Sequence, residues 1–189
     1  MSAASVHGRH VDMDGEPYYQ IQNSQNLPDF FMSIVGSDDH WMFVSSRGAL
    51  TAGRRNPDGA LFPYAADDQI SAKQSTTGPI SIFRFNAGGN SESTTWIPWL
   101  DSTGRNSGIA RAVYKSPWGS KVLFEETHLA SRLRFRYRWS FSPRFGFIRD
   151  CWLTNLSDEA CNVTWLDGLQ NLLPVGVGSE FWMRFSNLG

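Results

Sequence analysis

Two features of membrane and exported proteins are missing from this 189-residue sequence. No apolar run approaches the roughly 20 residues that a membrane-spanning helix needs. Residues 1–19 contain no apolar segment of the kind that forms the centre of a secretory signal peptide. We therefore expect a cytoplasmic protein that makes no contact with a membrane.

The sequence also lacks a strong excess of either charge. It has 17 Lys and Arg residues against 18 Asp and Glu residues, a net charge of −1. Proteins that bind nucleic acids usually carry a clear positive excess, so we expect no nucleic-acid partner. The histidines His7, His10, His40 and His128 are scattered, and no glycine-rich phosphate loop is present. We therefore expect neither a bound metal nor a cofactor.

Cysteine is scarce, since Cys151 and Cys161 are the only two. They flank a turn signal, and a hairpin centred near Leu156 would place them opposite each other on paired strands. Such a position allows a cross-strand disulfide. A reducing cytoplasm favours free thiols, which is the state we expect.

Helical periodicity is nearly absent, and short runs rich in β-branched and aromatic residues take its place. Clusters of Gly, Pro, Asn, Asp and Ser separate these runs and indicate turns. The predicted strands cover residues 18–22, 30–35, 41–46, 49–53, 80–85, 93–98, 109–116, 120–129, 130–141, 145–155, 161–169 and 181–185. The four runs from residue 120 to residue 169 predict an antiparallel meander of long strands.

These strands predict an all-β fold, a large antiparallel β-sandwich, because long strands with bulky residues on one face need a second sheet to cover them. Apolar residues make up 41% of the chain, which is enough for a folded core. We expect one domain over residues 1–189, or the N-terminal part of one, with residues 1–16 flexible. An incomplete sandwich would expose an unpaired edge and favour self-association.

In residues 129–141, large apolar residues alternate with arginines. The apolar set is Leu133, Phe135, Tyr137, Trp139 and Phe141, and the arginines are Arg132, Arg134, Arg136 and Arg138. Because successive side chains of a strand point to opposite faces, the apolar set predicts a core face and the arginines a polar face. Burial contributes roughly 1.5–3 kcal/mol per large apolar side chain, which is enough to fix the register.

Two interpretations of the arginine face stay open. In the first it is a solvated face whose arginines pair with Glu125, Glu126 and Asp150 on the neighbouring strands. In the second it binds an anion or docks a partner, a task that suits the planar guanidinium group. A charged strand face is more commonly a solvated face of this first kind.

Two tryptophans lie beside a proline that cannot donate a hydrogen bond to a central strand ladder. Trp96 and Trp99 flank Pro98, so this segment belongs at a sheet edge or in a loop. The two indole rings either plug the end of the sandwich or stack on sugar rings or on another domain. Arg47 and Arg54, in or beside turns, are candidates for contacting carbohydrate or an anion such as phosphate.

Several segments together resemble a known family. Residues 135–177 are similar to the N-terminal sandwich of the glycoside phosphorylases that act on cellobiose or chitobiose. Within them, RFGFIRDCWLTNLSDE resembles a strand followed by the family's T-N-x-S-D-E hairpin, and LDGLQNLLPVGV resembles the connection after it. The likeness covers most of the chain from about residue 30 onward. STTWIPW stands where the family has W-S-P-T, so the role of that loop is not carried over.

The resemblance implies a galactose mutarotase-like super-sandwich that precedes a helical linker and an (α/α)6 barrel with the catalytic acid. The family's sandwich is usually longer than this chain, so we expect a truncated domain. The implied function is a non-catalytic accessory domain of a glycoside phosphorylase or hydrolase, which shapes the active-site rim or docks on the barrel. Its partners would be carbohydrate, the missing catalytic domain or a second copy of the chain. The arginine face or the tryptophan edge would make the contact.

Two alternatives belong to other functional classes. A free-standing mutarotase-like epimerase needs an acid and a base beside the sugar ring. His128 and Glu126 are the candidates, because residues two apart on a strand share one face. A stand-alone carbohydrate-binding module is supported only by the aromatic content. Adjacent carboxylates such as Glu125 and Glu126 point to opposite faces and do not form a catalytic pair.

Overall fold

The fold is all-β, as the sequence predicted. The structure is a computed structural model that describes residues 5–36, 38–86, 93–100, 108–174, 176–178, 181 and 184. The helical segments named within them are short: η1 (Ser24–Asn26), η2 (Pro57–Gly59), α1 (Asp67–Ile70) and η3 (Ser71–Lys73). No helix in this described part of the chain is long and apolar enough to cross a membrane.

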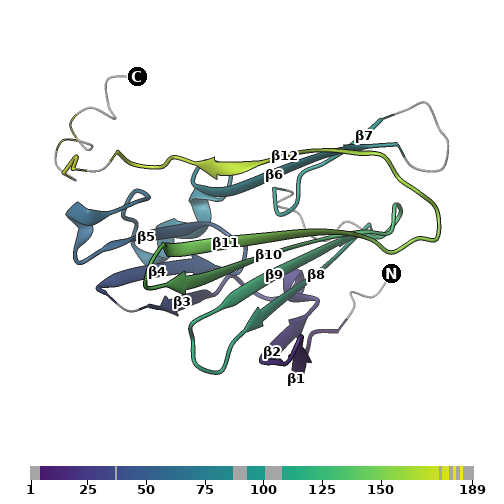
Figure 1. The fold of residues 1–189 in the computed structure, drawn as a ribbon, viewed down its shortest axis with the longest axis horizontal. Helices are drawn as coiled ribbons and strands as arrows, with labels where there is room; N and C mark the ends of the chain where they lie inside the picture. The colour runs from purple at the N-terminus through teal and green to yellow at the C-terminus, as the bar shows by residue number, and fades with distance from the viewer. Residues whose placement is uncertain are drawn as a thin grey trace.

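The largest layer is a six-stranded antiparallel sheet (Figure 1). In spatial order, its strands are β1 (His7–Met13), β2 (Glu16–Gln22), β8 (Ile109–Lys115), β9 (Val122–His128), β10 (Leu133–Ser142) and β11 (Gly146–Asn155). Most neighbours in this sheet are also consecutive in the chain. Only the pairing of β2 with β8 joins strands that are far apart in the sequence.

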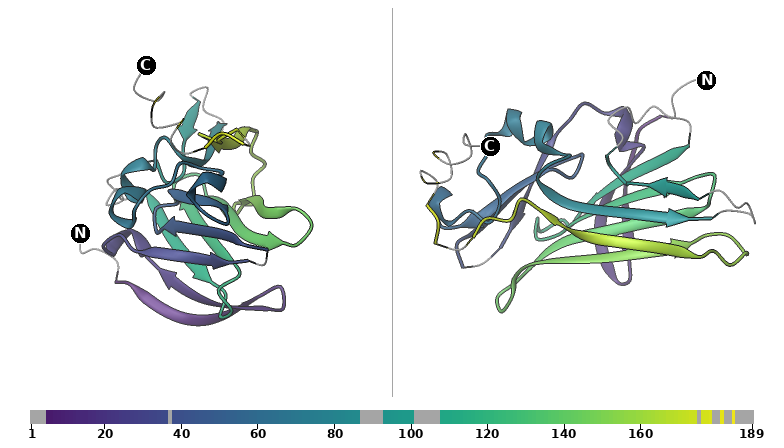
Figure 2. Two further views of the ribbon diagram at one scale, coloured as in Figure 1. Left: turned by 90° about the vertical axis from the view of Figure 1, so that its left-hand side faces the viewer. Right: turned by 90° about the horizontal axis from the view of Figure 1, so that it is seen from above.

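Two smaller sheets pack against the same core. One contains β12 (Val163–Gln170), β6 (Gly78–Phe85) and β7 (Thr94–Trp96), and the other contains β3 (Phe31–Val35), β4 (His40–Ser45) and β5 (Leu50–Arg54), each in this order. Figures 1 and 2 show β6 and β12 running along one side of the large sheet, and β3, β4 and β5 near one of its ends. The layers form a β-sandwich.

One hydrophobic core lies between the sheets. Strand β10 contributes Leu133, Phe135, Tyr137 and Trp139, each no more than 2% exposed. They pack with residues of the smaller sheets such as Phe83 on β6 and Met42 on β4. The predicted core face of residues 129–141 is therefore confirmed, although Phe141 at the end of the strand is only partly buried.

The N-terminal segment differs from its prediction. Residues 1–16 were expected to be flexible, but His7–Met13 form β1 and pair with all of β2. The turn between them has positive φ at Asp14 (56°) and Gly15 (80°). Asp-Gly is the residue pair that favours this two-residue hairpin turn, and it was the overlooked signal.

The predicted four-stranded meander is partly wrong. Strands β9, β10 and β11 pair consecutively, but β12 crosses to another sheet and pairs with β6 from Val163 opposite Phe85 to Gln170 opposite Gly78. Cys151 on β11 and Cys161 before β12 are therefore not on paired strands, and both are free thiols. The strand predicted over 181–185 falls largely outside the described residues, and Phe181 is helical.

Candidate functional site

The six-stranded sheet has two faces in different environments. Its inner face packs against the smaller sheets in the core. Its outer face consists of the alternate side chains that point the other way. It carries Tyr18, Gln20, Tyr114, Leu123, Glu125, Arg134, Arg136, Arg138, Asp150 and Trp152. Tyr18, Tyr114 and Leu123 belong to a small apolar cluster on this face, separate from the main core.

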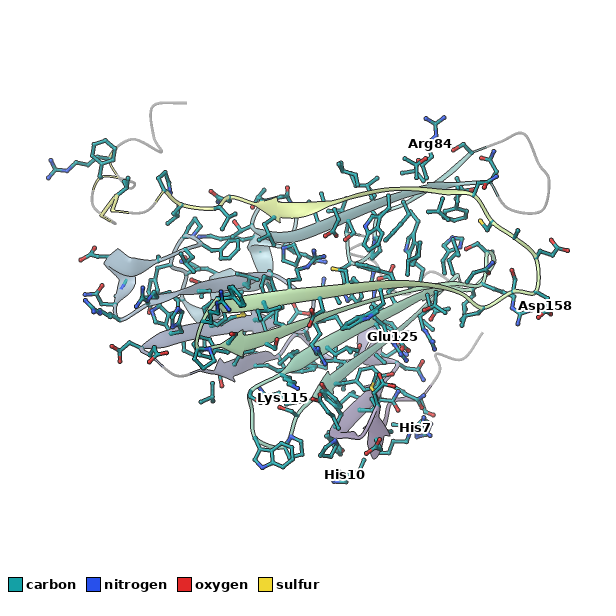
Figure 3. All side chains as sticks on the ribbon, viewed as in Figure 1. His7, His10, Arg84, Lys115, Glu125 and Asp158 are labelled. Carbon is teal, nitrogen blue, oxygen red and sulfur yellow. The ribbon has the colours of Figure 1, made fainter. Side chains whose placement is uncertain are left out.

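The arginines of the outer face are held by carboxylates of neighbouring strands. Arg136 Nε donates to Glu125 Oε2 at 2.5 Å, with Glu125 labelled in Figure 3. Arg138 Nη2 donates to Asp150 Oδ2 at 2.8 Å, and its Nη1 lies 3.6 Å from Glu16 Oε2. The predicted pairs with Glu125 and Asp150 are confirmed, because the strand register places them opposite the arginines.

The other two arginines of the predicted row differ from these. Arg132 lies in the turn before β10 with a φ of 53°, so it is not part of the strand face. Arg134 is on β10, and its Nε is shielded from solvent without a hydrogen-bond partner among the described residues. Along β10 the row therefore begins with Arg134, which has no carboxylate partner in the described part of the chain, and continues with the ion-paired Arg136 and Arg138.

A groove of about 260 Å³ lies on the outer face. It is lined by Met13, Asp14, Glu16, Tyr18, Leu123, Arg136, Arg138, Trp152 and Thr154. The Arg138 guanidinium lies 5.3 Å from the centre of the Trp152 ring, and 41% of Trp152 is exposed. The groove is slightly smaller than the ~300–1,000 Å³ of typical small-molecule pockets. It combines an aromatic surface with fixed charges.

Charges at the rim of the groove are organised by one carboxylate. Glu16 accepts hydrogen bonds from Lys121 and from Tyr18, the latter at 3.0 Å. The hydrogen bond from Lys121 is the main reason that the pKa of Glu16 lies below its ordinary value of 4.5. Glu16 is therefore ionised at neutral pH and joins β2 to the start of β9.

The predicted acid on the inner face is fully enclosed. Glu126 is 0% exposed, and its two carboxylate oxygens accept three hydrogen bonds. These come from Arg111 Nε at 2.7 Å, Trp96 Nε1 at 2.8 Å and the backbone N–H of Trp99 at 2.9 Å. The carboxylate fixes β7 and the segment after it to the large sheet. Glu126 does not pair with an arginine of β10, so that part of the prediction is wrong.

His128 shares the inner face with Glu126, as predicted. Its ring lies 5.6 Å from Phe85 and 5.8 Å from Trp96, and its Nδ1 is 2.8 Å from Ser131 Oγ. Burial lowers the pKa of His128, while the charge of Glu126 partly opposes this shift. The imidazole is thus neutral at neutral pH and packed among aromatic rings. The structure thus places His128 and Glu126 in one region, but Glu126 is buried in the core.

The two tryptophans of the predicted edge are core residues. Trp96 is 4% exposed and Trp99 is 5% exposed. The Trp96 ring lies 5.1 Å from Phe83, and the Trp99 ring lies 5.1 Å from Tyr137. This burial fits the interpretation in which the two indoles plug the sandwich, and it leaves little of either ring for a sugar to contact.

Arg47 and Arg54 are not brought together. Arg47 lies in the turn before β5 and pairs with Asp29 at 2.5 Å, whereas Arg54 is the last residue of β5 and lies opposite His40. They therefore do not form a joint anion site.

The inner face contains a buried charged residue, Arg111, that the sequence analysis missed. Arg111 on β8 is 8% exposed and forms the buried ion pair with Glu126. A signal was present, because Arg111 shares one face of its strand with the apolar Val113, which indicates a buried cation that needs a carboxylate. The residue serves the fold.

The thiol of Cys151 lies in an environment that does not activate it. Burial raises the pKa of Cys151 to about 12, so its reactive thiolate is scarce at neutral pH. No group of three or more His, Cys, Asp or Glu side chains suited to a metal ion occurs in the described residues. No family model matches the sequence, and a comparison with curated proteins found no match.

Proposed function

We propose that this chain is a non-catalytic β-sandwich module of a carbohydrate-active enzyme, related in kind to the accessory sandwich of glycoside phosphorylases and hydrolases. Its outer face is the surface that docks on the catalytic domain. The observation that carries this proposal is the contrast between the two acidic sites. The acid beside a histidine, Glu126, is enclosed by three donors, whereas the outer face presents aromatic and charged groups in an open groove.

The composition of the groove supports a role in contact with another molecule. Arg, Tyr and Trp are enriched at the centres of protein interfaces because they bury large areas and still form directed polar contacts. Here Arg136 and Arg138 are positioned by carboxylates before any partner arrives. Less side-chain freedom is then lost on binding, which favours affinity. The free thiols Cys151 and Cys161 also fit the reducing cytoplasm in which we place the protein.

Oxidative footprinting of tryptophan tests the docking role in the parent enzyme. Trp152 in the groove is 41% exposed and Trp118 in the β8–β9 turn is 73% exposed, so both side chains react in the isolated chain. We expect Trp152 to become protected in the parent enzyme while Trp118 stays reactive. Equal reactivity of Trp152 in the isolated chain and in the parent enzyme, or a gene that ends after Gly189, would contradict the proposal.

Charge reversal provides a second test of the same surface. Arg134→Glu combined with Arg136→Glu should leave the circular dichroism spectrum of the chain unchanged, because both side chains lie outside the core. In the parent enzyme, the double variant should lose the protection of Trp152. Loss of folding would show instead that the arginines are structural.

A carbohydrate-binding role is the second candidate, and Trp152 is the observation that favours it. An exposed aromatic ring beside fixed polar groups is a common way to hold a sugar. Titration with cello- and chito-oligosaccharides, followed by calorimetry, tests it. Trp152→Ala should abolish binding and Trp118→Ala should not. Absence of heat with every oligosaccharide would exclude this candidate.

A further inference from the structure

Strand β12 is an edge strand of unusual composition. It ends the order β12-β6-β7, so only one of its sides pairs with a described strand. Its sequence is VTWLDGLQ, which contains no Lys, Arg or Pro. Proteins usually protect a free edge with such residues or with a very short strand, because an open row of backbone N–H and C=O groups recruits other strands.

Two other edges in the molecule carry this protection. Strand β7, at the opposite edge of the same sheet, has only three residues and is followed closely by Pro98. Strand β1, at the edge of the large sheet, carries His7, Arg9, His10 and Asp12. Strand β12 has a single charge, Asp167, and Arg149 Nη1 on β11 neutralises it at 2.6 Å. Charge therefore does not block another strand from pairing with β12.

The side of the sandwich at β12 is also open. Strands β11 and β12 are the edges of their sheets, and Figures 1 and 2 show them on the same side of the molecule. Leu153 and Cys151, which point inward from β11, are only partly buried, and Trp165 and Leu169 on β12 are each 39% exposed. Apolar groups along this side would be covered if the sheet continued past β12.

Leu166 faces the other way. Thr164 on β12 lies opposite Arg84 on β6, and Figure 3 shows Arg84 pointing away from the sandwich interior. Leu166 is two residues from Thr164 and shares its face, and it is 64% exposed. Both faces of β12 thus carry apolar surface next to the free edge.

We propose that a second copy of this chain pairs its β12 antiparallel with this β12, across a two-fold axis at Leu166. Such an axis is perpendicular to the sheet, so each side chain stays on its own face of the sheet. Opposed residues of an antiparallel pair point to the same face. The only allowed registers are therefore those in which one residue lies opposite its own copy in the partner. Centring on Leu166 places it opposite the partner's Leu166 and pairs the strands from Val163 to Leu169.

The neighbouring registers are less favourable. Centring on Asp167 would place Leu166 opposite the partner's Gly168, which has no side chain for Leu166 to pack against. Centring on Trp165 would leave Leu169 beyond the paired part of β12. In the register centred on Leu166, Trp165 lies opposite the partner's Asp167 and Val163 opposite the partner's Leu169. The strand is complementary to itself in this register, and two three-stranded sheets become one continuous sheet.

Sedimentation velocity of the purified chain at micromolar concentration tests the proposal. We expect a species of twice 21.3 kDa for the unmodified chain. Leu166→Lys should give a monomer, since it adds charges that meet at the axis and the exposed position tolerates lysine in the folded chain. Leu129→Lys is the matched control, because Leu129 is 50% exposed in the turn after β9, and it should remain dimeric. A monomeric unmodified chain, or equal effects of the two lysines, would overturn the proposal.

Disulfide trapping tests the register. In a background of Cys151→Ser and Cys161→Ser, Leu166→Cys would place two thiols directly opposite each other. Opposed residues of antiparallel strands have Cα atoms about 4.5–5.5 Å apart, within the range that a disulfide spans. We expect a covalent dimer under mild oxidation. Thr164→Cys in the same background would lie opposite the partner's Gly168 and should not cross-link. Cross-linking of Thr164→Cys as readily as of Leu166→Cys would overturn the assigned axis.

Discussion

Glu125 and Glu126 are neighbours in the chain, yet they belong to two different regions of the molecule. Glu125 lies on the outer face, where it pairs with Arg136 and stays 15% exposed. Glu126 lies on the inner face, where Arg111 and two tryptophan N–H groups enclose it. The comparison teaches that similar ion pairs can lie in different environments: the inner pair anchors a strand in the core, and the outer pair holds charged groups on a partly solvated face. Their contributions to stability should differ accordingly.

The largest expected effect comes from removing the apolar core behind the arginines. Phe135→Ala should lower the free energy of unfolding by about 4 kcal/mol, because it deletes a fully buried ring and leaves a cavity. Urea unfolding measures the loss. Trp118→Ala, at an exposed position, should change stability by no more than about 0.5 kcal/mol. Similar losses for the two variants would contradict the assignment of the inner face.

The inner ion pair should come next. Glu126→Gln should cost about 3 kcal/mol, since breaking a buried ion pair by changing one partner leaves the other charge poorly compensated. The same urea experiment measures it. Glu125→Gln is the matched control on the outer face and should cost far less. If the two variants lose equal stability, the distinction between the faces fails.

A smaller effect should appear in the pH dependence of stability. The pKa of His128 is below its ordinary value of 6.5 in the folded protein because of burial. When pH falls below 6.5, the unfolded state binds the proton first, so the free energy of unfolding decreases until the folded pKa is passed. Chemical denaturation across this range should show the decrease. His128→Asn should flatten that part of the profile, and an unchanged slope would exclude His128 as its source.

The smallest effect is expected on the outer face. Arg136→Ala should cost up to about 1 kcal/mol, because its ion pair with Glu125 is partly solvated, and added salt should reduce the difference. Unfolding at low and high ionic strength measures both. A loss as large as that of Glu126→Gln would mean that the outer arginines hold the sheet together instead of forming a surface.

Local patterns in the sequence were enough to predict one face of the large sheet. The alternation around Phe135 gave the buried side of β10, and strand order alone placed Glu125 and Asp150 opposite Arg136 and Arg138. The alternation of side chains between two faces is a property of the strand itself, so it does not depend on which elements pack against the strand. The hairpin at Asp14 was equally local and could have been predicted from its turn residues.

Non-local features could not be predicted in the same way. The loop before β12 does not reveal whether the next strand stays beside β11 or crosses to β6, because either path satisfies a short connection. The bond between Trp96 and Glu126 joins positions 30 residues apart. Such a contact decides whether a tryptophan at a sheet edge is buried in the core or exposed for binding. Its burial therefore became clear only from the packed sheets.

Glu16 has a consequence for the shape of the outer face. It reaches Arg138 on β10 from β2, although β8 and β9 lie between them, and three strand spacings would separate the two strands by about 14 Å in a flat sheet. The two long side chains span this distance and bridge β8 and β9 on the outer face. Both side chains line the groove, so the outer face is hollowed here. A flat partner would meet only its rim, so a molecule that fills it must itself be rounded.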